Sequence, residues 1–352
     1  MPDWRSGMTQ TYEYYLVDPT TWKDKSLLNN VISCKINRDD ESETLGSASF
    51  SITDSIGEDY VRAYLVTVQN GIKERFALGT FLIQTPSSTF DGKVRSVTVD
   101  AYTPLLELKE VMPPLGYTIM EGENVMDCAY QIVKTNVRAP VVKTTDPTNL
   151  LQNFVANTND TWISFTEDLI ANAKYHFDLD EMGRVLFAPD QDTASLQPVW
   201  TYDDGNSSIL YPDITIDHDL YGIPNVVEVI YSEDSKCLYA KVVNDDPNSP
   251  ISTVNRGREI IYRDTSPAFA GIPSEKHIQE YAERLLRELS SIEYSVSYSH
   301  GYCPVRVGDC VRLNYSSAGL TNVKAKVVSQ SISCEPGCPV TETAVFTTKL
   351  WG

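Results

Sequence analysis

The stretch VRAYLVTVQNGIKERFALGTFLIQ, residues 61–84, decides the fold class of this chain. Two runs rich in β-branched and aromatic residues, Val61–Val68 and Arg75–Gln84, flank the dipeptide Asn70-Gly71. An Asn-Gly pair between two such runs favours the tight turn of a β-hairpin, because both residues tolerate a positive φ. The stretch therefore predicts two antiparallel strands.

The same pattern extends outward over residues 11–102. In Ala48–Ile52 and Val94–Val99, apolar and polar residues alternate, which places them on opposite faces of a strand. A second hairpin signal, Asp91-Gly92, follows further along. Residues 1–102 are therefore predicted to form a small antiparallel β-barrel or sandwich, of which the barrel is the preferred interpretation. Further strands are expected at Tyr12–Val17, Val31–Asn37, Ser47–Ile52 and Lys93–Ala101.

The composition changes at Thr103-Pro104, where an N-cap residue precedes the residue favoured at the first helical position. Apolar residues at helical spacing then predict helices over 124–135 and 161–174. A hairpin is expected next, with strands Tyr175–Leu179 and Val185–Ala188 and a turn at Asp180–Gly183. Residues 103–200 are thus predicted to form an inserted α+β domain.

Strands resume in residues 201–352 and predict a second β-barrel. They are expected at Ile214–Asp217, Asn225–Tyr231, Cys237–Val243, Glu259–Tyr262, Tyr294–Tyr298, Cys310–Tyr315, Val323–Ser333 and Val340–Thr347. One surface helix, 274–290, interrupts them, with an apolar stripe from Ile278 to Leu289 and charged residues elsewhere. The predicted fold class is mainly β: two small antiparallel barrels with an α+β insertion and one surface helix.

The charge of the chain limits its partners. Among 352 residues, 48 are acidic and 29 are Lys or Arg, so the net charge is −19. A general nucleic-acid binder normally carries a basic surface to neutralise phosphates, which argues against that class. No apolar run reaches 18 residues, so we expect no membrane span. The N-terminus lacks the pattern of a signal peptide, and seven cysteines without an export signal favour reduced thiols.

Catalytic patterns are missing from the sequence. It contains no His-Glu-x-x-His, no Gly-x-Ser-x-Gly and no phosphate loop, and its four histidines lack a patterned nucleophile or base. Asp178, Asp180 and Gly183 match three positions of a calcium loop, but Met182 and Pro189 stand where ligands are needed. A hairpin turn accounts for these residues. The prediction is a non-enzyme with no catalytic residue and no organic cofactor site.

Four of the seven cysteines lie in the last 50 residues: Cys303, Cys310, Cys334 and Cys338. Four thiolates suit tetrahedral zinc or an iron–sulfur cluster. If Tyr315 faces Val323 in an antiparallel pair, Cys310 faces Val328, which is six residues before Cys334. At ~3.3 Å per residue, Cys310 and Cys334 would then lie about 20 Å apart. A fold-back of the chain at Gly308-Asp309 would close this gap. The alternative is four small apolar residues packed in strands.

Several strings in their order resemble the baseplate hub proteins of contractile-tailed phages, including defective prophages of Gram-positive bacteria. These strings are Leu78–Ile83, Ser96–Tyr102, Trp162–Phe165, Tyr175–Asp178, Gly183–Phe187, Ile223–Val229 and Val307–Val311. The resemblance implies a structural homotrimer at the tip of the tail tube, with two barrel-like tube domains per subunit. Six such domains would match the sixfold tail tube, or a tube-initiator ring, above the hub, and a threefold spike protein below it.

The resemblance also implies other baseplate proteins as partners, assembly in the bacterial host cytoplasm and a final location in the virion. Passing DNA would cross the hub without specific binding. Related tail-tip proteins hold an iron–sulfur cluster, which supports a metal at the four cysteines. An acidic bore would repel phosphates over about 8 Å at physiological salt. Two alternatives are a cell-wall hydrolase of the same tail and a receptor- or glycan-binding tail module.

Overall fold

The computed structural model describes residues 1–351 except 54–56, 91–94, 234–235, 268 and 270–272. The chain divides into two compact units. The first unit comprises Met1–Ile214 and Ser297–Ala344, and the second comprises Thr215–Val296 and Val345–Gly352. The domain boundaries 1–102, 103–200 and 201–352 stay a prediction. In the described residues, no helix is both long and apolar enough to cross a membrane.

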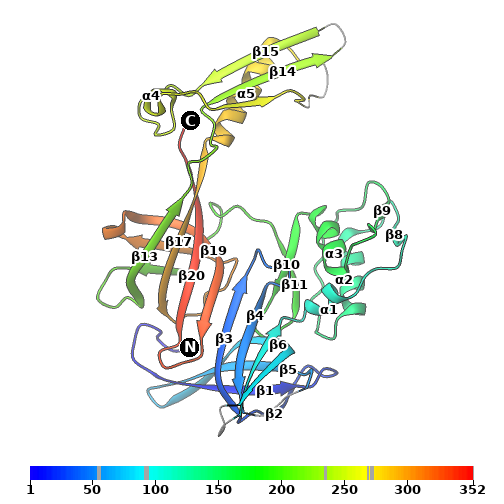
Figure 1. Ribbon diagram of the computed structural model, residues 1–352, viewed down its shortest axis with the longest axis vertical. Helices are drawn as coiled ribbons and strands as arrows, with labels where there is room; N and C mark the ends of the chain where they lie inside the picture. The colour runs from blue at the N-terminus through cyan, green and yellow to red at the C-terminus, as the bar shows by residue number, and fades with distance from the viewer. Residues whose placement is uncertain (54–56, 91–94, 234–235, 268, 270–272, 352) are drawn as a thin grey trace. The chain divides into compact units, whose positions relative to one another are not determined.

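The described residues are mainly β, as predicted, and most strands belong to one 13-stranded sheet. The first strand-rich region supplies β1 (Thr9–Val17), β2 (Asp24–Leu27), β3 (Val31–Asp39), β4 (Gly46–Ile52), β5 (Tyr60–Gln69), β6 (Ile72–Phe90) and β7 (Arg95–Tyr102). The second supplies β12 (Trp200–Asp203), β13 (Leu210–His218), β17 (Ser291–Gly301), β18 (Cys310–Tyr315), β19 (Leu320–Ser333) and β20 (Pro339–Lys349). The order is β13-β17-β20-β19-β3-β4-β7-β6-β5-β1-β2, and most of these strands are labelled in Figure 1. Off this path, β18 pairs with β19, and β12 pairs with β18.

The prediction of two closed barrels is corrected by this order, because no closed barrel is found in the part of the chain that the structure describes. The physical reason is the antiparallel pairing of β3 with β19, from Ser329 opposite Asp39 to Ser333 opposite Lys35. One edge of β3 pairs with β4 and the other with β19. Its backbone groups are therefore satisfied by strands from both regions, and the sheet continues instead of closing on itself.

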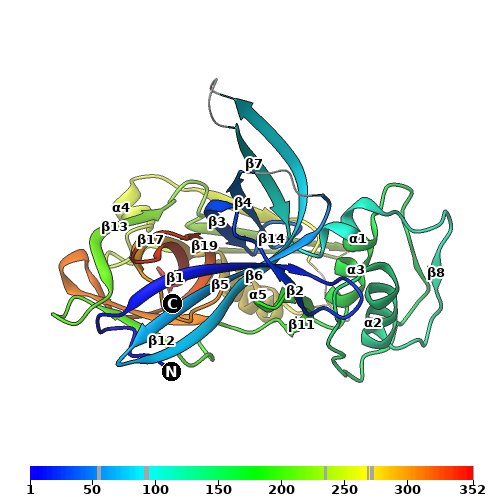
Figure 2. The ribbon, with the colours of Figure 1, turned by 90° about the horizontal axis from the view of Figure 1, so that it is seen from below.

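The hairpin predicted from residues 61–84 is present in the structure. Gln69 of β5 pairs with Ile72 of β6 around Asn70 and Gly71, whose φ angles are 51° and 78°. These positive values are those of the tight hairpin turn that Asn-Gly favours. β6 and β7 continue as a long ribbon, seen clearly in Figure 2. The second predicted turn, Asp91-Gly92, lies outside the described residues.

The α+β region of the first unit contains α1 (Leu106–Glu110), α2 (Val125–Asn136) and α3 (Trp162–Ala171). It also contains the paired strands β8 (Thr118–Ile119) and β9 (Phe154–Val155), and the hairpin of β10 (Tyr175–Leu179) and β11 (Val185–Pro189). Asn124 caps α2, and Thr161 forms a capping box with Ser164 at the start of α3. The apolar faces of these helices join one core with Trp22 and Tyr60 from the sheet region.

In the second unit, β14 (Val226–Glu233), β15 (Lys236–Val243) and β16 (Ile261–Asp264) form a three-stranded sheet. A short helix, α4 (Thr253–Arg256), precedes β16, and α5 (Glu275–Leu289) lies against the sheet. Ile278, Ala282 and Leu286 of α5 are buried, which confirms the predicted stripe. They pack on β14 and β15 through Val227, Val229, Tyr231, Ala240 and Val242.

Candidate functional site

The turn between β10 and β11 is anchored on a buried arginine of the sheet. Arg62 of β5 has a side chain that is 1% exposed, and its guanidinium donates to the Met182 carbonyl at 3.0 Å. The same guanidinium donates to Thr80 Oγ1 at 2.8 Å and pairs with Asp24 at 2.9 Å. Trp22 Nε1 also donates to the Met182 carbonyl, at 2.7 Å. A buried charge is stable only when paired and fully hydrogen-bonded, and Arg62 meets this requirement.

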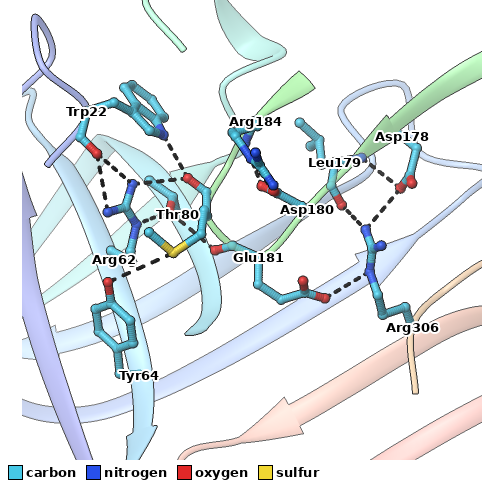
Figure 3. Close-up of polar contacts among 11 residues, drawn as sticks. Trp22, Arg62, Tyr64, Thr80, Asp178, Leu179, Asp180, Glu181, Arg184 and Arg306 are labelled. Carbon is cyan, nitrogen blue, oxygen red and sulfur yellow. Dashed lines mark hydrogen bonds and ion pairs between the residues drawn. The ribbon is translucent and has the colours of Figure 1, made fainter. Parts of the chain in front are cut away.

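A second arginine holds the other side of the turn (Figure 3). Arg306, in the loop before β18, pairs through Nε with Glu181 at 2.9 Å and through Nη2 with Asp178 at 3.4 Å. It also donates to the Leu179 carbonyl. Burial disfavours its charge, but Glu181 and Asp178 outweigh burial, so the pKa of Arg306 lies above its usual value. We call residues 178–184, with Arg62 and Arg306, the hairpin clasp.

The clasp links three parts of the chain. Glu181 also lies 3.8 Å from Nη2 of Arg38 in β3, and Arg38 donates to Gln330 of β19 at 3.1 Å. Gly183 has a φ of +73°, and a Cβ there would lie 2.7 Å from Cβ of Thr80, so only glycine fits. The predicted turn at 180–183 is confirmed. The α+β region is thus fixed to strands from both strand-rich regions.

Beside the clasp lies a cleft of about 1000 Å³ within the first unit. Eleven acidic residues line it, against three Lys or Arg. On α3, Glu167 has a pKa raised to about 7 by burial and by the nearby charges of Glu43 and Asp168. Burial likewise raises the pKa of Asp309. The cleft therefore concentrates negative charge more strongly than its own cations neutralise.

The structure brings two of the four predicted metal-ligating cysteines together and places the other two elsewhere. Cys334 and Cys338 flank one turn, in which the Cys338 N–H donates to the Glu335 carbonyl at 2.9 Å, and burial together with the charge of Cys334 raises the pKa of Cys338. Cys303 Sγ lies 3.3 Å from the Tyr202 hydroxyl, and Cys310 pairs with Lys326, eight residues before Cys334 on β19 and thus about 26 Å along the strand. Among the described residues, no group of three or more His, Cys, Asp or Glu is placed to hold a metal ion. The four-cysteine zinc or iron–sulfur site stays a prediction.

A buried polar network surrounds His300 of β17. Its side chain is fully buried, with Nδ1 2.7 Å from the Gly301 carbonyl and Nε2 3.0 Å from the Tyr202 hydroxyl. Nε2 also lies 3.4 Å from Glu342, which accepts from Gln330 at 2.7 Å. Burial lowers the pKa of His300, but Cys303 and Glu342 outweigh it and raise the pKa to about 10. A protonated ring donates from both nitrogens, as these acceptors require.

The sequence analysis did not predict the roles of Arg62 and Arg306, although the sequence around Arg62 contains a signal of its burial. Arg62 stands inside the run Tyr60–Val66, all of which is buried in β5. A charged residue within such a continuous apolar run marks a buried, paired side chain. Arg306 and Cys34, which lies beside Cys334, carried no comparable local signal.

No protein-family model matches the chain, and no curated protein matches it. Solved structures do. A tail protein from Neisseria meningitidis superposes with a TM-score of 0.60 at 13% identity, covering 96% of this chain and 97% of that one. The 43 kDa tail protein of prophage MuSo2 from Shewanella oneidensis gives 0.62 at 10% identity, covering 96% and 98%. The chain has the fold of phage tail proteins.

A third likeness extends the comparison beyond phages. An E. coli component of the type VI secretion system, described as similar to the bacteriophage T4 tail proteins gp27 and gp5, gives a TM-score of 0.51. Its identity to this chain is 9%, and the match covers 92% of this chain and 75% of that one. The predicted resemblance to tail hub proteins is therefore confirmed at the level of the fold, over nearly the whole chain.

Proposed function

We propose that the protein is a structural hub of a phage baseplate or phage-like particle, and not an enzyme. One observation carries the proposal: two tail proteins share the fold with coverage of at least 96% of both chains. The match extends over nearly the whole of each compared chain, so the shared fold as a whole, and not one local segment, supports the proposal.

The hub would be a homotrimer that joins the sixfold tail tube, or a tube-initiator ring, to a threefold spike protein. In each subunit, the strand set β1–β7 and the strand set β12, β18–β20 would act as two tube-type modules, so that three subunits present six. A ring needs heterologous contacts that close after a fixed number of copies. The clasp and the β3–β19 pairing support this role because they link the two strand sets within the first compact unit.

The remaining partners follow from the same proposal. Other baseplate proteins would bind outside the ring, DNA would pass through it without specific binding, and the trimer would reside in the virion. Carboxylates facing the passage would repel phosphates and keep DNA from adhering.

Two measurements test the proposed hub function: the molar mass of the protein in solution and its assembly with tail tube protein. Light scattering of the purified chain should give three times 39.4 kDa, and micrographs with tail tube protein should show capped tubes. A monomer at every concentration that never enters tail particles would refute the hub. Clearing of peptidoglycan in a zymogram would instead support the cell-wall hydrolase, and binding to host glycans without tube assembly would support the receptor-binding module.

A further inference from the structure

Cys34 of β3 and Cys334, directly after β19, face each other across the seam between the two strand sets. Ile36 pairs with Ile332 and Lys35 with Ser333, so the next opposed pair is Cys34 and Cys334. The backbone N–H of Cys334 donates to the Cys34 carbonyl at 2.9 Å. Directly opposed residues in an antiparallel pair point to the same face. Ile36 and Ile332, two residues along, are buried at 0% and 1% exposure, so both thiols point toward the core.

This arrangement fits the geometry of a disulfide. Hydrogen-bonded antiparallel pairs have Cα atoms about 5.5 Å apart. Disulfides span Cα separations of about 4.4–6.8 Å, with the most common value near 5.5–6 Å. The Cβ atoms of such a hydrogen-bonded pair lie toward the upper end of about 4.5–5.5 Å, whereas a disulfide needs about 3.5–4.5 Å, so the bond would draw the two strands together by about 1 Å at this end of the pairing.

The surroundings of the two thiols differ, which sets the order of reaction. Cys34 is 4% exposed, and burial together with the Cys334 thiol raises the pKa of its own thiol well above the usual value. Cys334 is partly exposed. Burial raises the pKa of Tyr14, and the charges of Cys334 and Cys34 raise it further, while the side chain of Cys338 is fully buried.

We propose that Cys34 and Cys334 form an intramolecular disulfide by exchange with a low-molecular-weight disulfide such as oxidised glutathione. The bond would join the two strand sets covalently once the protein leaves a reducing cytosol. This inference rests on the pairing of β3 with β19 and does not depend on the proposed hub function.

The exchange proceeds in two steps. The Cys334 thiolate attacks one sulfur of the small disulfide, which forms a mixed disulfide and releases one small thiolate that takes up a proton. The Cys34 thiolate then attacks Cys334 Sγ, which breaks the mixed disulfide and releases the second small thiolate. The protein loses two electrons and two protons, and one small disulfide is reduced to two small thiols.

The test uses the full chain, purified under reducing conditions and then incubated with oxidised glutathione at about pH 8.5, near the usual thiol pKa. We expect two of the seven free thiols to disappear, and non-reducing peptide mapping to show Cys34 linked to Cys334. The oxidised chain should unfold at least about 5 °C higher than the reduced chain, because the bond closes a loop of 300 residues (334 − 34).

Matched variants separate the bond from general oxidation. C237S removes an exposed thiol and should leave the cross-link and the stabilisation unchanged. C34S should stop the reaction at a glutathione adduct on Cys334. A cross-link between Cys334 and Cys338, a stable glutathione adduct on Cys334 in the unmodified chain, or thiols of Cys34 and Cys334 that stay reduced would each overturn the inference. So would thiols that react only after a chelator removes zinc or iron.

Discussion

Substituting Arg62 by Met tests whether the clasp is an energetic anchor. R62M keeps the apolar stem of the side chain and removes the guanidinium. The change deletes donors to Thr80 Oγ1 and the Met182 carbonyl, and the ion pair with Asp24 at 2.9 Å. Because the Arg62 side chain is 1% exposed, water cannot easily replace these donors.

The size of the effect follows from which acceptors retain a partner. Removing one member of a buried ion pair costs about 3–5 kcal/mol. Asp24 keeps Arg75 at 3.3 Å, and the Met182 carbonyl keeps Trp22 Nε1 at 2.7 Å. We therefore expect R62M to lower the free energy of unfolding by about 3 kcal/mol, the lower end of that range. At about 2–4 °C per kcal/mol for a large domain, the midpoint of thermal unfolding should fall by roughly 6–12 °C.

The assay is thermal unfolding, with limited proteolysis across residues 178–184 as a local readout. R75M is the matched control, since Arg75 pairs with the same Asp24 carboxylate but its side chain is 40% exposed. Exposed pairs contribute about 0–1 kcal/mol, so R75M should hardly change the midpoint. Equal midpoints for R62M and R75M, with no new cleavage in the hairpin, would refute the view that the buried arginine anchors the turn.

Three further outcomes follow from the described contacts. G183A should lower the free energy of unfolding, measured in urea, by at least about 1–2 kcal/mol, since Gly183 has a positive φ and a Cβ there would meet Thr80. G116A is also at a positive φ but has open space around it, so its loss in the same urea assay should be smaller. Because the pKa of His300 is raised to about 10 in the folded chain, protonated His300 contributes its full stability below about pH 6.5, and this stability is lost as the pH rises toward 10. Urea unfolding at a series of pH values should show the free energy of unfolding decline over this range, and the decline should be smaller in H300Q. L286A should destabilise the second unit by about 2–5 kcal/mol in the same assay, because Leu286 is fully buried under its sheet; a loss below 1 kcal/mol would contradict that packing.

Local signals in the sequence predicted elements well. The helix expected over 124–135 is α2, Val125–Asn136, because Asn124 caps it and its apolar face repeats at helical spacing. The expected hairpin at 175–188 matches β10 and β11. In each case, the deciding residues lie within a few positions of one another, so a short window contains the whole physical cause.

Pairing between distant strands could not be predicted in this way. Cys34 and Cys334 are neighbours only because β3 pairs with β19, and no local pattern records a contact between residues 300 positions apart (334 − 34). The same gap explains why two barrels were expected, since each region reads as a complete strand set on its own. The error in the position of Cys310 has a local cause: a register shift between Leu313 and Tyr315 sets Tyr315 opposite Leu320, so Cys310 lies opposite Lys326 and farther from Cys334 than expected.

Charge compensation at the clasp limits how much of the net charge of −19 could act on DNA in the proposed hub. Asp178 and Glu181 are compensated at close range by two cations, Arg306 and Arg38, so the field of these carboxylates decays over a short distance. On α3, Glu167 and Asp168 have no ion-pair partner among the described residues, and the pKa of Glu167 is raised by burial first and then by the charges of Glu43 and Asp168. Screening confines such a field to about 8 Å at physiological salt. An acidic passage would therefore have to be lined by unpaired carboxylates of this kind, and total charge alone does not create one.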